Sequence, residues 1–467
     1  MYQGTINMPN DILQTACEYA WTYPVLNIGE RTLRNCCRTP QEKISLENLN
    51  LGTDLFKKFI PIRSIKYDLL RGIKNNNCST CWDTEAVGGT SSRTGFERFA
   101  KFINATKWLN ITLEETKAKL LNLSDDDINE LVNWEHPKKV EIMLSTICDL
   151  KCVYCNDTFS SQWYSEKVKY KEIPIKQANT NVEEYENIWW SWFESVACET
   201  VVDISFVGGE PLLDVKLYQY INRILNIRQE KNITSNLVIS IVTNFNTPKK
   251  YLNEFLKLLQ RISNTKNVHL SVCISFESLE KQNSFIRTGS KWELFQDNIN
   301  EMMIFLKNNK IYKSITIHAL PAFCSLSVSN MLPFVSYVVS LMEKHSRLML
   351  ISKTHVSHPL WSSPFILTPD YITYIDETIE YLKNLKIQNL DHVQLPYFNT
   401  WKKEFIQYLD SIKTGIVNVN TNLNSSEINE LRKDFANNID KIVARNTLDF
   451  NSTFPEMIDF YNLCKEL

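Results

Sequence analysis

The chain has 467 residues, 43% of them hydrophobic and 22% charged, so it can bury a core and is long enough for two or three domains. Its 51 lysines and arginines nearly balance 53 aspartates and glutamates, which argues against a nucleic-acid partner. The N-terminus has no basic start followed by an apolar run, and no stretch reads as a membrane span. We therefore expect a cytoplasmic protein without a membrane partner.

Residues 1–133 combine short apolar segments with cysteines and then helices. Helices are predicted at Thr94–Ala105 and at Leu113–Leu121, where Thr112 is a plausible N-cap and acidic residues occupy the first turn. The cysteines of this region form the first of two groups: Cys17, Cys36, Cys37, Cys78 and Cys81. Four others are isolated, and we expect them to be small buried side chains. These are Cys198, Cys273, Cys324 and Cys464.

From Pro137 the pattern alternates between apolar, β-rich runs and amphipathic segments of helical length. The predicted strands are Lys139–Ser145, Val202–Val207, Leu237–Thr243, Val268–Phe276, Ser314–Leu320 and Leu348–Ser352. The predicted helices between them include Val182–Ala197, Val215–Glu230, Trp292–Lys307 and Met331–Lys344. Repeated strand–helix units imply an α/β fold with a parallel sheet, and about six of them suggest a partial (βα)6 barrel like an open TIM barrel.

After about residue 366 the chain becomes mainly helical, with helices predicted at Tyr371–Asn384, Trp401–Lys413 and Ser426–Ala444. We therefore divide the chain into a cysteine-rich domain (1–133), a strand–helix domain (134–365) and a helical C-terminal extension (366–467). Within the helix at 182–197, four aromatic residues at helical spacing are typical of a core face. They are Trp189, Trp190, Trp192 and Phe193.

Cys148, Cys152 and Cys155 form a C-x3-C-x2-C motif directly after the first predicted strand. Three thiolates on one loop can bind three corners of a cubane iron–sulfur cluster and leave the fourth iron open for a substrate or cofactor. Zinc is the alternative, but it usually has a fourth cysteine or histidine nearby. The neighbouring histidines here are His136 and the distant His269.

The triplet, with Tyr154 before its third cysteine, resembles the signature of the radical S-adenosylmethionine (SAM) superfamily. The segment Gly208-Gly209-Glu210-Pro211 follows the second predicted strand, and it resembles the family segment that meets the SAM amino group. Two glycines let the backbone approach a ligand, and Glu210 can balance an ammonium charge. The resemblance implies a [4Fe–4S] cluster held by the three cysteines, with SAM at its open iron.

Other strand ends resemble further SAM contacts of that family. The third predicted strand ends at a polar pair, Thr243-Asn244, and the fourth ends at Ser275 and Glu277, where ribose and methionine contacts are common. Arg287 resembles an arginine that pairs with the SAM carboxylate. The fifth strand ends at His318–Pro321, where backbone contacts to adenine would lie. Loops at strand ends also hold ordinary turns, which is the alternative at each position.

The N-terminal cysteines resemble the auxiliary-cluster modules called SPASM and twitch, placed here before the barrel rather than after it. The matching parts are Cys17, a turn at Gly29, Cys36-Cys37, the region Leu46–Gly72 and Cys78-Ser-Thr-Cys81. The resemblance implies an auxiliary iron–sulfur cluster, with the choice between Cys36 and Cys37 open. A zinc ribbon fits the spacing nearly as well.

Two polar and aromatic segments are candidates to face substrate, although an ordinary surface loop is the alternative for each. One follows the C-x2-C and contains Trp82, Glu85, Ser91, Ser92 and Arg93. The other, Ser160–Trp163, lies just past the cysteine triplet and resembles a segment of the twitch proteins.

The resemblance implies that SAM is cleaved reductively to methionine and a 5′-deoxyadenosyl radical, which abstracts hydrogen from a small molecule or short peptide. An external electron donor such as flavodoxin or ferredoxin would then be a partner, and the protein would orient substrate and exclude water. Two alternatives stay open. A noncatalytic iron–sulfur or zinc module would need no SAM pocket, and a polar SAM-dependent methyltransferase would need a Gly-rich loop after its first strand.

Overall fold

The computed structural model describes residues 12–86, 91–134, 136–176, 182–423 and 425–467. Two segments that matter to the predictions lie outside these ranges: the N-terminal residues 1–11, where no secretory signal is expected, and residues 87–90, after the C-x2-C. Within the described ranges, no helix combines the length and the apolar character needed to cross a membrane.

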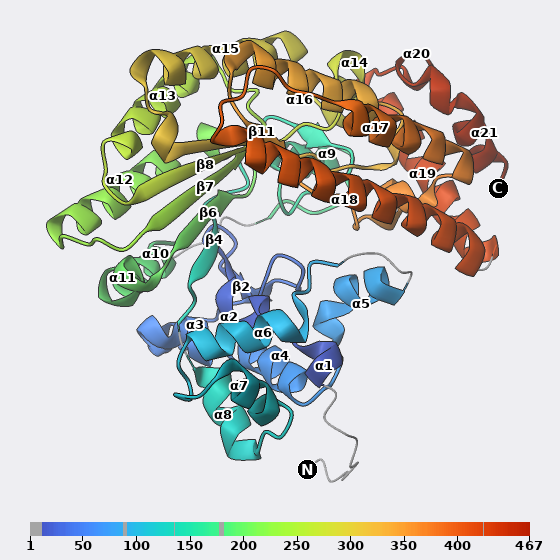
Figure 1. Cartoon of the computed structure of the whole chain (residues 1–467). Helices are drawn as coiled ribbons and strands as arrows, with labels where there is room; N and C mark the ends of the chain where they lie inside the picture. The colour runs from blue at the N-terminus through green and yellow to red at the C-terminus, as the bar shows by residue number, and fades with distance from the viewer. Residues whose placement is uncertain (1–11, 87–90, 135, 177–181, 424) are drawn as a thin grey trace.

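A sheet of nine strands runs through the molecule in the order β11-β10-β8-β7-β6-β4-β1-β2-β3 (Figure 1). Six neighbouring strands, from β4 to the edge strand β11, are parallel: β4 (Lys139–Met143), β6 (Asp203–Val207), β7 (Leu237–Thr243), β8 (Val268–Ile274), β10 (Ile315–Ala319) and β11 (Met349–Ile351). Each lies within one of the six predicted strands, so the parallel α/β sheet is confirmed. Its closure into a partial barrel stays a prediction.

Helices connect these strands and cover the sheet, with α10–α13 gathered along one side in Figure 1. They are α10 (Val182–Trp192), α11 (Cys198–Thr200), α12 (Val215–Glu230), α13 (Lys249–Ser263), α14 (Glu280–Ile286), α15 (Trp292–Asn309) and α16 (Met331–His345). The predicted helix at 182–197 ends in a π-helical turn, Phe193–Ala197. Its aromatic cluster is buried, as the helical spacing predicted. Of the isolated cysteines, Cys198, Cys324 and Cys464 are buried and Cys273 is half-buried.

The N-terminal region adds a hairpin to one edge of the sheet. β1 (Val25–Asn27) pairs with β4 in parallel, and β2 (Thr32–Arg34) and β3 (Glu42–Lys43) follow antiparallel. The backbone N–H of Ile28 donates to the Met143 carbonyl at 2.9 Å, which anchors the turn at Gly29 beside the end of β4. The hairpin therefore joins the cysteine-rich region to the sheet directly.

Short helices make up most of the rest of this region: α1 (Ile12–Thr15), α2 (Tyr19–Thr22), α3 (Leu55–Lys58), α4 (Ile60–Leu70), α5 (Ser79–Ala86), α6 (Gly95–Ala105), α7 (Leu113–Leu120) and α8 (Asp125–Asn133). Thr112 caps α7 as predicted, in a capping box with Glu115. A small separate core includes Trp21, Phe99 and Leu131. In contrast, hairpin residues pack in the core of the sheet.

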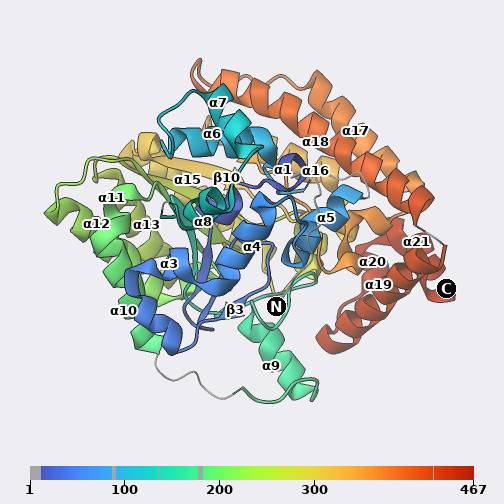
Figure 2. The ribbon, with the colours of Figure 1, turned by 90° about the horizontal axis from the view of Figure 1, so that it is seen from below.

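The C-terminal extension is helical, as predicted, and packs on the core of the sheet. It contains α17 (Ile372–Asn384), α18 (Gln394–Asn422), α19 (Ser425–Asn446), α20 (Phe450–Thr453) and α21 (Ile458–Glu466). α18 is longer than predicted because its buried stripe continues from Phe398 to Val419. Figure 2 looks onto the N-terminal helices, with α10–α13 on one side of them and α17–α21 on the other.

Candidate functional site

Cys148, Cys152 and Cys155 lie on the loop that follows β4, which we call the cysteine loop (residues 145–160). A short antiparallel pairing of β5 (Lys151–Cys152) with β9 (Arg287–Thr288) places Cys152 opposite Arg287. The Cys155 N–H donates to the Cys152 carbonyl at 2.9 Å and closes a turn. The loop ends at Ser160, whose hydroxyl donates to the Leu150 carbonyl at 2.7 Å and also caps α9 (Ser161–Lys169).

Two glycines allow the end of β6 to pack directly on this loop. A Cβ atom at Gly209 would lie 2.1 Å from the Ile147 carbonyl oxygen, and one at Gly208, whose φ is +126°, would lie 2.8 Å from the Ser145 carbonyl oxygen. The Glu210 N–H donates to that Ile147 carbonyl at 2.6 Å. Only glycine permits so close a backbone approach, so both residues shape the cysteine loop.

The three cysteines open into one cavity of about 370 Å³ at the carboxyl ends of the parallel strands. Other predicted site residues that line it are Tyr154, Gly208, Gly209, Asn244, Ser275 and Arg287, together with Leu320 and Pro321 of the fifth strand end. The size is that of a site for a small organic ligand. Folding therefore brings residues from four predicted strand ends to the cysteine triplet.

Glu210 does not line this cavity, because its carboxylate is turned into the protein. It accepts hydrogen bonds from the Thr243 hydroxyl at 2.6 Å, the Leu212 N–H at 3.0 Å and the Asn244 N–H at 2.5 Å. Burial raises the pKa of Glu210 to about 7. Its role in this structure is to tie the end of β6 to the end of β7, and its neighbour Pro211 is buried beside it.

Glu277 and Arg287 form a buried ion pair beside the cysteine loop. The Arg287 Nη2 lies 2.7 Å from Glu277 Oε2, and the Tyr154 hydroxyl donates to Glu277 Oε1 at 2.9 Å. Burial alone would lower the pKa of Arg287, but the charge of Glu277 raises it well above the usual value. Arg287 Nη1 also lies 3.8 Å from the Cys152 sulfur. The arginine predicted to meet a SAM carboxylate thus already has a carboxylate partner in the protein.

Replacing Arg287 by methionine is expected to lower the free energy of unfolding by about 3 to 5 kcal/mol, because Glu277 would stay buried without its cation. Urea unfolding followed by tryptophan fluorescence measures the loss. The double variant Glu277→Gln/Arg287→Met removes both charges and should recover most of it. Equal destabilisation of the single and double variants would show that packing, rather than the buried charge, accounts for the effect.

All three thiols of the triplet are partly buried. Burial raises the pKa of all three, that of Cys148 to about 12, so loading a metal must displace their protons. The Leu150 N–H donates to the Cys148 sulfur at 3.4 Å. Within the described residues, no three His, Cys, Asp or Glu side chains converge as they would around one metal ion. In a cubane each cysteine binds a different iron, whereas zinc gathers four ligands around one ion.

All five N-terminal cysteines surround a second, smaller cavity of about 30 Å³. Cys17 lies between α1 and α2, Cys36 and Cys37 follow β2, and Cys78 and Cys81 lie at and just inside the start of α5. Burial raises the pKa of Cys78 to about 12. Both candidates for the fourth ligand line this cavity, so the choice between Cys36 and Cys37 stays open.

The two segments proposed to face substrate are mostly engaged with the protein. Arg93 forms an ion pair with Glu85 at 2.8 Å and lies 5.0 Å from the Trp82 ring centre. The Trp163 indole N–H donates to the Cys152 carbonyl at 2.9 Å, and the Ser161 hydroxyl accepts from the Cys148 N–H at 3.1 Å. Ser160 lines the 370 Å³ cavity, and Trp82, Ser92 and Arg93 line the smaller cavity of the N-terminal cysteines.

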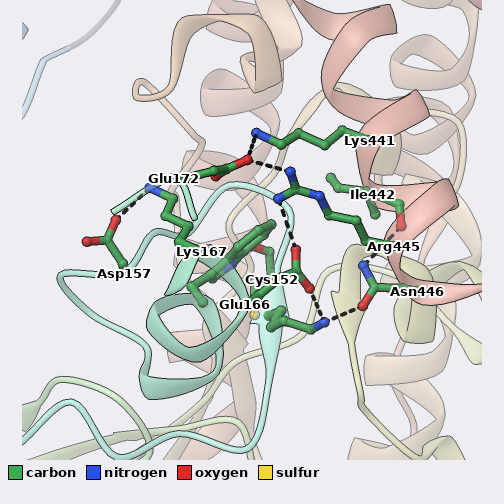
Figure 3. A network of polar contacts seen from close by, with 11 residues as sticks. Cys152, Asp157, Glu166, Lys167, Glu172, Lys441, Ile442, Arg445 and Asn446 are labelled. Carbon is green, nitrogen blue, oxygen red and sulfur yellow. Dashed lines mark hydrogen bonds and ion pairs between the residues drawn. The ribbon is translucent and has the colours of Figure 1, made fainter. Parts of the chain in front are cut away.

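The C-terminal extension also holds the cysteine loop, through a polar network between α9 and α19 (Figure 3). Lys151, next to Cys152, pairs with Glu166 and hydrogen-bonds the Asn446 side chain. Beyond α9, Glu172 pairs with Arg445 and with Lys441, the latter at 2.6 Å, and these bonds lower its pKa to about 2. A further cavity of about 580 Å³ lies between these elements and reaches Tyr154 and Cys155.

Sequence reasoning missed Arg38, Thr354 and His355, which also line the 370 Å³ cavity. Thr354 and His355 follow β11, so the rule that strand ends carry ligands would have found them. Arg38 follows Cys37 in a loop, and no local pattern marks it.

No protein-family model matches the chain, and a search of curated proteins finds no match. Among solved structures, the chain is similar to Streptococcus suis SuiB bound to its precursor peptide SuiA, with 15% identity, a TM-score of 0.32, and coverage of 82% of this chain and 68% of that one. SuiB bound to S-adenosylmethionine gives the same values. Histidine-tagged anSMEcpe with bound AdoMet is similar at 15% identity and a TM-score of 0.33, covering 52% of this chain and 58% of that one. These are distant likenesses.

Proposed function

We propose that this protein is a radical SAM enzyme that binds a [4Fe–4S] cluster through Cys148, Cys152 and Cys155. One observation carries the proposal: the three cysteines of one loop open into the same cavity as the polar residues at the ends of neighbouring parallel strands. A structural metal site would need the cysteines alone. Because the cysteines line a cavity of ligand size, we infer that a second molecule binds at the cluster.

A cluster held by Cys148, Cys152 and Cys155 would supply the one electron needed to cleave SAM into methionine and a 5′-deoxyadenosyl radical, the species that would abstract hydrogen from the substrate. The chain's own residues prepare the site for this. The Leu150 N–H and the Arg287 guanidinium point at cysteine sulfurs and would favour their thiolate forms.

For SAM, we propose contacts with Asn244, Ser275 and the backbone beside Gly208 and Gly209, all of which line the cavity. The carboxylates of Glu210 and Glu277 do not line the cavity and would act on SAM through other residues. Glu210 positions Asn244 through its N–H, and Glu277 holds Tyr154 and Arg287 in place. This arrangement orients a ligand from neutral donors rather than by a direct ammonium–carboxylate pair.

For the N-terminal cysteines, we propose an auxiliary iron–sulfur cluster, with zinc as the alternative metal. Their cavity and the larger one share Arg38 as a lining residue, so a substrate in the larger cavity would lie between the two metal sites. We propose a small molecule or short peptide as substrate and a flavodoxin or ferredoxin as electron donor. The second candidate function is a noncatalytic iron–sulfur or zinc module.

The decisive experiment is anaerobic reconstitution of the full chain, followed by iron and sulfide analysis and by an assay for 5′-deoxyadenosine after adding SAM and a strong reductant. About eight irons per chain with SAM cleavage would support two cubanes. About four irons with cleavage would support the enzyme and assign zinc, or no metal, to the N-terminal site. Zinc without SAM cleavage would overturn the proposed function and favour the noncatalytic module.

A further inference from the structure

Arg38 lies at the boundary between the two cysteine groups. It lines the 370 Å³ cavity together with the cysteine triplet, and it lines the 30 Å³ cavity together with the N-terminal cysteines. A third small hollow of about 20 Å³ contains Arg38 again, with Cys81 and His355. A guanidinium at this position faces whatever molecule lies between the two groups.

Within the described residues, Arg38 has only neutral hydrogen-bond partners. Its Nε donates to the Ser92 hydroxyl at 3.3 Å and its Nη1 donates to the Ser357 hydroxyl at 2.9 Å. The other arginines at these sites differ, because Arg287 pairs with Glu277 and Arg93 pairs with Glu85. Arg38 interacts electrostatically with Glu141 on β4, but that carboxylate is buried and does not line the cavity.

Besides the three cysteines, which would be thiolates when loaded, the charged side chains among the described residues that line the cavity are those of Arg38 and Arg287. No aspartate or glutamate lines it within that part of the chain. A partly desolvated guanidinium gains most from a charged oxygen partner, which it can bind with two parallel N–H donors. Since Arg287 already has its carboxylate, Arg38 is the cation that an incoming anion would meet.

His355 adds a neutral donor on the same side. Its Nδ1 lies 3.3 Å from the Tyr408 hydroxyl. Burial raises the pKa of Tyr408 well above its usual value, so the hydroxyl keeps its proton. Burial and the nearby charge of Arg38 lower the pKa of His355 to about 4, so the ring is neutral at pH 7. In the tautomer that accepts the Tyr408 hydroxyl at Nδ1, the ring proton lies on Nε2. A neutral imidazole N–H stabilises an anion without repelling Arg38.

We propose that Arg38, assisted by His355, binds an anionic group of the substrate, a carboxylate or a phosphate, and thereby holds the substrate between the two cysteine groups. That the anion belongs to a substrate rests on the proposed function, but the anion site itself does not depend on SAM chemistry. Ser92 and Ser357 orient the guanidinium, so they are positioning residues for the same site.

Isothermal titration calorimetry on the reconstituted full chain, at constant ionic strength, tests the proposal with inorganic phosphate and with glutarate as probes. Each titration is run before and after saturation with SAM, so that binding at the SAM carboxylate contact is recognised. We expect Arg38→Gln to weaken binding at least about tenfold, as the loss of a charge-assisted hydrogen bond requires. Arg38→Lys, which keeps the charge but loses the planar fork, should be intermediate.

Two further variants make the test independent of folding and of general charge effects. Ser357→Ala leaves Arg38 in place but removes a hydroxyl that orients it, and we expect severalfold weaker binding. Arg223→Gln removes a cation whose side chain is 49% exposed on α12 and paired with Glu194, and it should bind the probes like wild type. Preference for phosphate would indicate a phosphorylated substrate, and preference for glutarate a carboxylate; either supports the proposal.

Failure of wild type to bind both probes, or equal affinity in wild type and Arg38→Gln, would overturn the anion site. The assay for 5′-deoxyadenosine without substrate runs in parallel and reports on the proposed function alone. Cleavage of SAM without an Arg38-dependent anion site would remove only this inference. An Arg38-dependent anion site without SAM cleavage would remove the radical SAM proposal and leave the anion site standing.

Discussion

Replacing Cys152 by alanine is expected to abolish SAM cleavage and to remove about four irons per chain. Cys152 is the middle cysteine of the triplet; it lies opposite Arg287 in the β5–β9 pairing and lines the cavity. Losing a direct ligand should reduce 5′-deoxyadenosine formation by more than about 100-fold, the upper range for losing an outer-shell partner. Iron analysis and the assay for 5′-deoxyadenosine on anaerobically purified protein measure both changes.

Cys198→Ala is the matched control, because Cys198 is buried in α11 and lies outside both cysteine groups. It should keep the iron content and the SAM cleavage of wild type, with only a small loss of stability. If Cys152→Ala retains wild-type cleavage, the triplet is not the catalytic cluster site. If both variants lose iron equally, the loss reflects general instability.

Replacing Gly209 by alanine is expected to lower both the thermal midpoint and the iron content. The added Cβ would lie 2.1 Å from the Ile147 carbonyl oxygen, so the end of β6 and the cysteine loop must separate. A clash with backbone cannot be relieved by rotating a side chain, and we expect a loss at or above the about 1 to 3 kcal/mol typical of overpacking. Calorimetry of the metal-free chain and iron analysis after reconstitution measure the two effects.

Gly95→Ala separates this clash from the general effect of adding a methyl group. Gly95 has a φ of +73°, but no atom lies within 4 Å of its added Cβ. Alanine there should cost only the about 1 to 2 kcal/mol of the left-handed conformation and leave the iron content unchanged. A Gly209→Ala protein that takes up iron as well as Gly95→Ala would contradict the close packing of β6 on the cysteine loop.

Local patterns were enough to predict the elements that bury one face. β7 alternates buried and half-buried side chains along its whole length, and both β7 and α12 have the predicted bounds. The period-two repeat of strands and the helical repeat each involve only neighbouring residues, so both can be recognised from the sequence alone. The spacing of the cysteine triplet is equally local, because three ligands on one short loop need no distant partner.

The partners of the charged residues could not be predicted in the same way. The SAM contacts expected of Glu210 and Glu277 stay predictions, and in this structure their carboxylates bind Thr243, Asn244, Tyr154 and Arg287. A charged side chain that folding buries needs protein hydrogen bonds, and which groups supply them depends on how strand ends meet. The spacing of residues along the sequence does not show which strand ends come together.

By itself, then, the sequence determined a parallel α/β sheet, its main helices and a three-cysteine loop at the end of the first central strand. The tertiary structure decided that the N-terminal hairpin joins the sheet edge, that Lys151 meets Asn446 across 295 residues, and that Arg38 meets Ser357 across 319. Periodicity reports only whether a side chain faces the core. The identity of the side chain that it meets is set by the packing of distant elements, which no local repeat encodes.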